Sequence, residues 1–88
     1  MNDNLVSVIL PTYNRKHTIK KALYSVLQQT YSNLEVIIID DGSTDNTSEL
    51  IASYTDIRIH YIYSPQNNGV SIARNTGISQ ANGEYIAF

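Results

Sequence analysis

Short apolar runs alternate with longer amphipathic stretches along this chain of 88 residues, and this alternation most constrains its fold. Four runs are typical of strands: residues 5–10, 34–39, 57–63 and 84–88. Between them, residues 16–29, a shorter stretch that begins among residues 43–46, and residues 70–81 carry apolar residues at helical spacing. Each strand-to-strand step takes roughly 25 residues, the length that a right-handed parallel crossover needs. The sequence therefore predicts a doubly wound α/β fold with a mainly parallel sheet.

The first three predicted strands differ in their polarity. The first, Leu5 to Leu10, is closed by Pro11, which cannot donate to a sheet ladder. The second, Leu34 to Ile39, is apolar nearly throughout, so we expect both of its faces to be covered. The third, Ile57 to Tyr63, has the alternation of a half-exposed strand and is expected near a sheet edge.

Composition argues against several classes of protein. The chain has no cysteine, which excludes disulfide frameworks, thiolate zinc sites and cysteine nucleophiles. Its net charge is -2, so it lacks the basic field that holds a nucleic acid backbone, and we expect no nucleic acid partner. Residues 1–4 are polar without a basic segment, and the apolar run after them is too short for a signal peptide or a membrane span. We therefore expect a cytoplasmic protein with no membrane segment in this chain.

Polar residues follow the strands in three loops, residues 11–15, 40–45 and 64–69. Ligands of parallel α/β sheets bind beyond the carboxyl ends of the strands, so these loops form the candidate site. Tyr13 offers a ring on which a base can stack, and Asp41 offers a carboxylate that can read a base edge. Asp40, in contrast, is expected to accept hydrogen bonds from backbone amides at its own turn. The loops therefore favour a heterocyclic ligand.

Common phosphate-binding motifs are missing from the chain. Neither G-x-G-x-x-G after the first strand nor G-x-x-x-x-G-K-[ST] occurs, which disfavours dinucleotide-binding and P-loop proteins. A diphosphate would then need a divalent cation held by carboxylates. Asp40 and Asp41 are candidates by composition, but neighbouring residues leaving a strand point to opposite sides. We therefore expect no metal ligand in this chain.

Three ordered motifs resemble those of family 2 glycosyltransferases. They are residues 6–14 (VSVILPTYN), residues 36–45 (VIIIDDGSTD), and Asn68-Gly69 followed by residues 73–77 (ARNTG). The resemblance spans essentially the whole chain and implies the GT-A fold, a Rossmann-like nucleotide-binding half followed by an acceptor-binding half. It also implies transfer of a sugar, with inversion, from a nucleotide diphosphate sugar to a hydroxyl of a saccharide or lipid-linked acceptor. A UDP-sugar donor and a role in cell-envelope polysaccharide synthesis are expected.

The resemblance assigns roles to individual residues. Eight of them would hold the nucleotide sugar: Pro11, Thr12, Tyr13, Asn14, Arg15, Asp41, Asn67 and Arg74. The first three would line the base site, with the next two beside it. Asp41 would accept a hydrogen bond from the uracil ring N–H, and the last two would lie near the nucleotide. The residues themselves agree for Tyr13 and Asp41, because a stacking ring and an acceptor suit a base that carries an N–H.

The chain departs from the family pattern at its end. The family carries an Asp-x-Asp element that binds Mg²⁺ or Mn²⁺ after the fourth strand, and this chain ends at Phe88, just before that position. The acceptor half and its catalytic base would also lie further on. We therefore expect residues 1–88 to be the N-terminal nucleotide-sugar-binding part of an incomplete domain, truncated after the fourth strand, with no catalytic residue and no activity alone. The full-length enzyme would use the metal and could work at the inner face of the membrane.

Two other interpretations stay open. A receiver-like signalling domain also places acidic residues at strand ends, but its acidic pair would follow the first strand, where this chain has Pro11 and Thr12. A non-catalytic interaction module would use the apolar surface that a truncated sheet exposes. Such a surface predicts oligomers or strand exchange.

Overall fold

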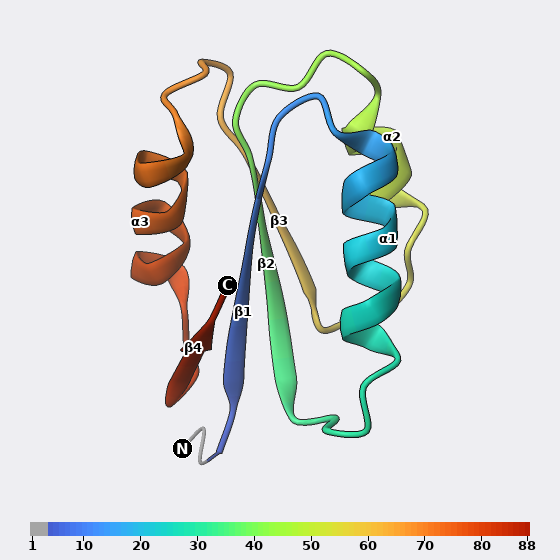
Figure 1. The fold of residues 1–88 in the computed structure, drawn as a ribbon, viewed down its shortest axis with the longest axis vertical. Coiled ribbons are helices and arrows are strands. Elements are labelled where there is room, and N and C mark those ends of the chain that lie inside the picture. Colours follow the sequence, from blue (N-terminus) through green and yellow to red (C-terminus); the bar gives the residue numbers. More distant parts are fainter. Residues whose placement is uncertain (1–3) are drawn as a thin grey trace.

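The computed structural model describes residues 4–88; residues 1–3, on which the expectation of no leader sequence partly rests, lie outside the described part. The elements follow in the predicted order (Figure 1): β1 Val6–Thr12, α1 Lys16–Leu27, β2 Leu34–Asp40, α2 Thr47–Ala52, β3 Ile59–Tyr63, α3 Val70–Gln80 and β4 Tyr85–Ala87. Among the described residues no helix is long and apolar enough to cross a membrane.

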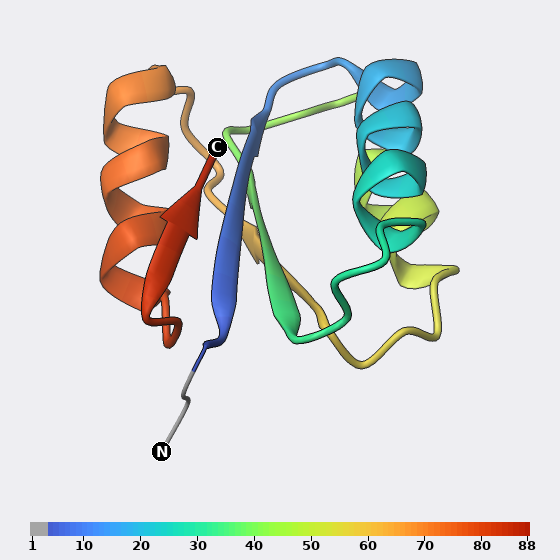
Figure 2. The same ribbon diagram turned by 60° about the horizontal axis from the view of Figure 1, so that its bottom comes forward.

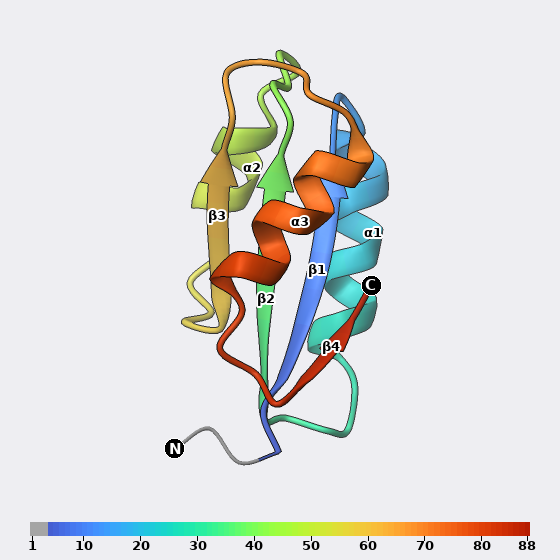
Figure 3. The same ribbon diagram turned by 90° about the vertical axis from the view of Figure 1, so that its left-hand side faces the viewer.

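The four described strands form one parallel sheet with the order β3-β2-β1-β4 (Figure 3). The predicted edge position of β3 is confirmed. At the other edge, β4 pairs with β1 only through Val6, Ser7 and Val8. The strand order reverses between β1 and β4, so the loops that leave the carboxyl end of β1 start at a topological switch point, where sheets of this kind bind ligands.

Helices cover both faces of the sheet, as predicted (Figures 1 and 2). Every residue of β2 is buried, and its side chains alternate between the two faces. One cluster joins Leu34, Val36 and Ile38 of β2 to apolar residues of α1 and α2. The other joins Ile37 and Ile39 to β1 and to α3. The central strand is thus fixed from both sides, and the loop that follows it is held in one place.

The prediction that Pro11 ends the first strand is wrong, because β1 continues through Thr12. Val6 donates to Asn33 O at 3.1 Å and Thr12 O accepts from Asp41 N at 2.9 Å, so the even-numbered residues of β1 bond toward β2. By alternation Pro11 turns toward β4, whose pairing stops at Val8. The missing N–H of Pro11 therefore costs no ladder bond.

The third strand begins later than predicted, at Ile59 instead of Ile57. A turn occupies the intervening residues, since the carboxylate of Asp56 accepts from Arg58 N at 2.9 Å and its carbonyl accepts from Ile59 N at 3.2 Å. Ile57 is 92% exposed at this turn. The alternating pattern of residues 57–63 therefore predicted a strand that starts two residues too early. Residues 57 and 58 belong to a turn that local hydrogen bonds hold.

Candidate functional site

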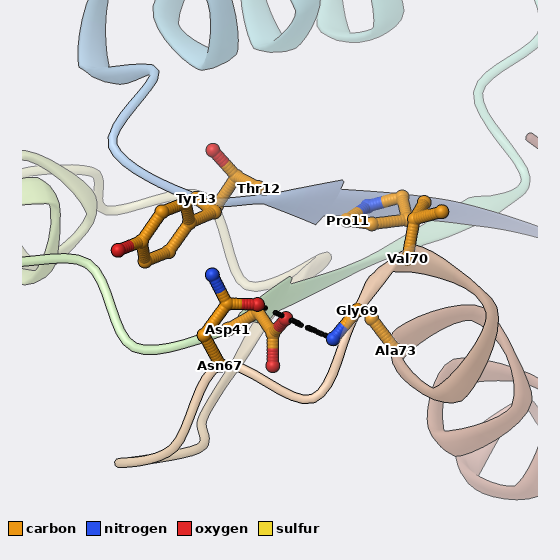
Figure 4. A pocket seen from close by; sticks show the side chains of 8 residues that line it. All are labelled: Pro11, Thr12, Tyr13, Asp41, Asn67, Gly69, Val70 and Ala73. Atoms are coloured by element: carbon orange, nitrogen blue, oxygen red, sulfur yellow. Dashed lines mark hydrogen bonds between the residues drawn. The ribbon is translucent and has the colours of Figure 1, made fainter.

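A pocket of about 140 Å³ lies at the carboxyl ends of β1 and β2 (Figure 4). Three segments meet there: the end of β1, the residue after β2, and the loop that leads into α3. The lining residues are Pro11, Thr12, Tyr13, Asp41, Asn67, Gly69, Val70 and Ala73. The structure thus brings five of the eight predicted nucleotide-binding residues into one pocket.

Asp41 is fixed at the floor of this pocket by the loop before α3. Its side chain accepts hydrogen bonds from Asn68 N at 2.9 Å and Gly69 N at 2.8 Å, and the residue is 6% exposed. A carboxylate offers about four acceptor positions, so two such bonds leave capacity for a ligand N–H. Asp41 is therefore a preorganised acceptor rather than a mobile one.

Asp40 lies on the other face of the sheet, as predicted for neighbouring strand residues. It is fully buried and accepts from Ser43 N at 2.8 Å and from the Tyr61 hydroxyl at 2.5 Å. Burial, together with this hydrogen bond and the nearby charge of Asp40, raises the pKa of Tyr61 well above its ordinary value. Asp40 is thus structural, and the two carboxylates cannot hold one ion between them.

Tyr13 and Asn67 form the accessible rim of the pocket, beside Asp41 in Figure 4. Tyr13 is 43% exposed, so part of this side chain is accessible to a ligand. Asn67 Oδ1 accepts from Gly69 N at 3.2 Å. The Thr12 hydroxyl points away from Asp41 and is a buried oxygen without a hydrogen-bond partner among the described residues.

The remaining three predicted residues lie outside this pocket. Asn14 connects two loops, since its N–H donates to Ser43 Oγ and its Oδ1 accepts from Thr44 N, both at 2.8 Å. Arg15 and Arg74 line an adjoining pocket, also of about 140 Å³, that shares Pro11 and Thr12 with the first one. Two arginines thus line a pocket that adjoins the candidate base site.

A protein-family model described as glycosyl transferase family 2 matches residues 7–88. The chain belongs to glycosyltransferase family 2. Among curated relatives, the UDP-Glc:alpha-D-GlcNAc-diphosphoundecaprenol beta-1,3-glucosyltransferase WfgD of Escherichia coli is 44% identical over 88 residues, which is 100% of this chain and 35% of the relative. The chain thus spans about a third of the length of that family member.

Solved structures of glycosyltransferases have the same fold. S. aureus TarS 1-349 in complex with UDP-GlcNAc matches with a TM-score of 0.85 and 33% identity, over 92% of this chain and 24% of that one. The mannosyltransferase PcManGT of Pyrobaculum calidifontis, in complex with GDP-Man and Mn²⁺, matches with a TM-score of 0.83 and 31% identity, over 92% of this chain and 25% of that one. The predicted GT-A type fold is confirmed, and the chain covers about a quarter of it.

Three lining residues of this family 2 chain escaped prediction as site residues: Gly69, Val70 and Ala73. Gly69 has a φ of +94°, a conformation that residues other than glycine rarely adopt, and it presents its N–H to Asp41. The Asn-Gly pair that marks the end of the loop was the available signal. The register that places Val70 and Ala73 over the pocket comes from the packing of α3.

The described residues do not fit a divalent cation. Residues 4–88 contain no group of three or more His, Cys, Asp or Glu side chains that could hold a metal ion. Asp40 and Asp41 face opposite sides of the sheet and accept bonds there from protein donors. No step that uses a metal can be assigned to residues 4–88.

Proposed function

We propose that this chain is the nucleotide-sugar-binding part of a longer glycosyltransferase that transfers a sugar, with inversion, from a nucleoside diphosphate donor to an acceptor hydroxyl. The observation that carries the proposal is the pairing of an exposed ring, Tyr13, with a fixed carboxylate, Asp41, in one pocket at the switch point of the sheet. Stacking on an aromatic ring contributes about 1 to 3 kcal/mol per base.

A base with a ring N–H fits this pocket best, and we propose that the base is uracil. Asp41 offers acceptor positions only, so it suits the N3–H of uracil and repels the bare ring nitrogen of cytosine. The relative WfgD is named for UDP-Glc, and TarS is seen with UDP-GlcNAc, which supports a UDP-sugar. Guanine also carries a ring N–H, and PcManGT is seen with GDP-Man, so GDP is the competing nucleotide.

The diphosphate would lie in the adjoining pocket beside Arg15 and Arg74. Guanidinium groups bind phosphate oxygens through charge-assisted hydrogen bonds. Arg74 now rests over the ring of Phe88, 5.6 Å from its centre, which holds it near the end of β4. The residues that bind Mg²⁺ or Mn²⁺, and the catalytic base, would belong to a part of the enzyme outside this chain. The chain alone would bind a nucleotide without transferring sugar.

We also propose that further protein packs against α3 and β4. Large apolar side chains are exposed on both elements: Val70, Ile72, Ile78, Tyr85, Ile86 and Phe88. Such a surface is normally covered in a soluble protein. In the isolated chain the same surface would drive self-association, which sedimentation at several protein concentrations measures.

Titration with UDP, followed through backbone amide signals, tests the nucleotide proposal. We expect shifts at Tyr13, Asp41 and Gly69, with weak affinity. CDP is the matched control, because it keeps the diphosphate and changes the ring N–H to an acceptor. Tyr13→Ala should lower the affinity for UDP by about 1 to 3 kcal/mol, whereas Tyr24→Ala, on the outer face of α1, should not change it. A folded spectrum without shifts at millimolar UDP would favour a non-catalytic interaction module instead.

A further inference from the structure

The outer face of α1 carries an exposed stripe of basic and aromatic side chains. His17, Lys20, Lys21, Tyr24 and Ser25 line one shallow groove there, at the spacing of a single helix face. Ile19 and Leu23, which are buried in the core, occupy the opposite face. Tyr24 is 68% exposed. The helix lies on the outside of the molecule, away from α3 (Figure 1).

Positive charge is concentrated around this stripe. Of the 6 Lys and Arg residues in a chain of net charge -2, four fall within residues 15–21. Within the described part of the chain, ion pairs join Arg58 to Asp56 and His60 to Glu35, so neither Lys20 nor Lys21 has a carboxylate partner. Both ammonium groups are available to an external anion.

Helix stability does not explain this arrangement. The first turn of α1 has no acidic residue and its last turn has no basic one, although acidic residues near the start and basic residues near the end would suit the helix dipole. The cations instead gather in the half of the helix where the dipole is unfavourable to them. Their placement therefore points to an external partner.

We propose that this face of α1 docks on the surface of an anionic phospholipid bilayer. Lysines near an anionic surface each strengthen binding, and tyrosine is suited to the headgroup region because its ring is apolar and its hydroxyl is polar. A nucleic acid fits less well, because the chain as a whole is negative and the patch is small. The inference goes beyond nucleotide binding. If the acceptor is lipid-linked, docking on the membrane would bring the enzyme close to it.

Sedimentation of the 88-residue chain with vesicles tests the proposal. We expect binding to vesicles of phosphatidylcholine mixed with phosphatidylglycerol, little binding to phosphatidylcholine alone, and weakening as salt is raised. Each lysine removed should cost about fivefold in partitioning, so the double variant Lys20→Gln/Lys21→Gln should lose about 30-fold. Tyr24→Ala should lose less. The matched control for Lys20→Gln is Arg58→Gln, which also removes one positive charge but lies just before the edge strand β3. This variant should keep nearly all binding.

Two results would overturn the proposal: equal sedimentation of the parent and the double lysine variant, or equal binding to vesicles with and without phosphatidylglycerol. Binding of a duplex oligonucleotide that depends on Lys20 and Lys21, without vesicle binding, would assign the surface to nucleic acid. The double variant should still show the UDP shifts at Tyr13 and Asp41. This readout separates a failure of membrane docking from a failure of the fold or of the nucleotide proposal.

Discussion

The hydroxyl of Ser7 donates a 2.5 Å hydrogen bond to Oε2 of Glu35, and both side chains are buried between β1, β2 and the start of β4. The same Oε2 accepts from Asn82 N at 2.7 Å, and Ser7 Oγ accepts from Gly83 N at 2.8 Å. These bonds connect the two central strands to the turn that precedes β4. Because β4 pairs with β1 through only three residues, this polar network is a main support of its position.

Replacing the buried carboxylate should loosen the β4 edge. Both carboxylate oxygens of Glu35 accept hydrogen bonds. In Glu35→Gln an N–H₂ group replaces one of these acceptors, so two donors face each other and one is left without a partner. Such a loss costs about 1 to 3 kcal/mol. We expect a lower urea midpoint and faster hydrogen exchange at Tyr85, whose N–H donates to Leu5 O at 3.2 Å. The matched control is Glu49→Gln on the exposed side of α2, which should change stability by less than about 1 kcal/mol. Identical urea midpoints for the two variants would contradict this role of Glu35.

Stability should fall in acid, and the sign follows from two carboxyl groups. Burial raises the pKa of Glu35, but hydrogen bonds from Ser7 and Asn82 outweigh it, so the pKa lies below the ordinary 4.5. Hydrogen bonds from the side chain and backbone of Arg58 lower the pKa of Asp56 from 3.8 to about 2. A carboxyl group with a lowered pKa stabilises the fold above its ordinary pKa, and this contribution is lost as pH falls through the folded value.

The measurement is the urea midpoint as a function of pH. We expect the contribution of these two groups to be constant near neutral pH and to decline from about pH 4.5 toward pH 2. Glu35→Gln should decline less steeply over the upper part of this range, because it lacks the carboxyl group of residue 35. A parent chain whose stability does not change down to pH 2 would exclude the proposed protonation.

Gly77 should resist replacement for a steric reason. Alanine in a helix is normally more stable than glycine by about 1 kcal/mol. A Cβ at Gly77, however, would lie 2.5 Å from Cγ2 of Ile9, which is fully buried under α3. We expect Gly77→Ala to destabilise the fold by about 1 to 3 kcal/mol, and the exposed Asn75→Ala on the same helix to be neutral or stabilising. Thermal unfolding of both variants compares the two effects directly; stabilisation by Gly77→Ala would contradict the close packing.

Much of the fold could be predicted from local patterns. The uniformly apolar sequence of β2 predicted a central strand, and the alternating sequence of β3 predicted an edge strand. Consecutive residues of a strand face opposite sides of the sheet, so their polarity shows whether one face or both are buried. The predicted end of β1 was wrong. Whether Pro11 ends a strand depends on which neighbouring strand the missing N–H of Pro11 would face. Such information lies in the pairing of β4 with β1, far along the chain.

The site divides in the same way. Tyr13 and Asp41 could be predicted because each directly follows a strand. The bonds from Asn68 and Gly69 to Asp41 could not, since they join loops more than 25 residues apart. The Glu35 network was also missed, because a single Glu within an apolar strand does not reveal its partners. Long-range hydrogen bonds, rather than element types, are what the sequence pattern lacks.

Gly69 should be needed for the shape of the candidate pocket more than for packing. Its φ is +94°, yet a Cβ there would meet nothing within 4 Å, so Gly69→Ala adds backbone strain of about 1 to 3 kcal/mol without a clash. Relief of that strain would turn its N–H away from Asp41. If the chain binds UDP as proposed, we expect affinity to fall about tenfold, which corresponds to about 1.4 kcal/mol. Asn68→Ala is the control, because it keeps the backbone N–H that donates to Asp41, and should bind UDP nearly as the parent does. UDP titration of both variants measures the difference; equal affinities would show that this bond does not organise the pocket.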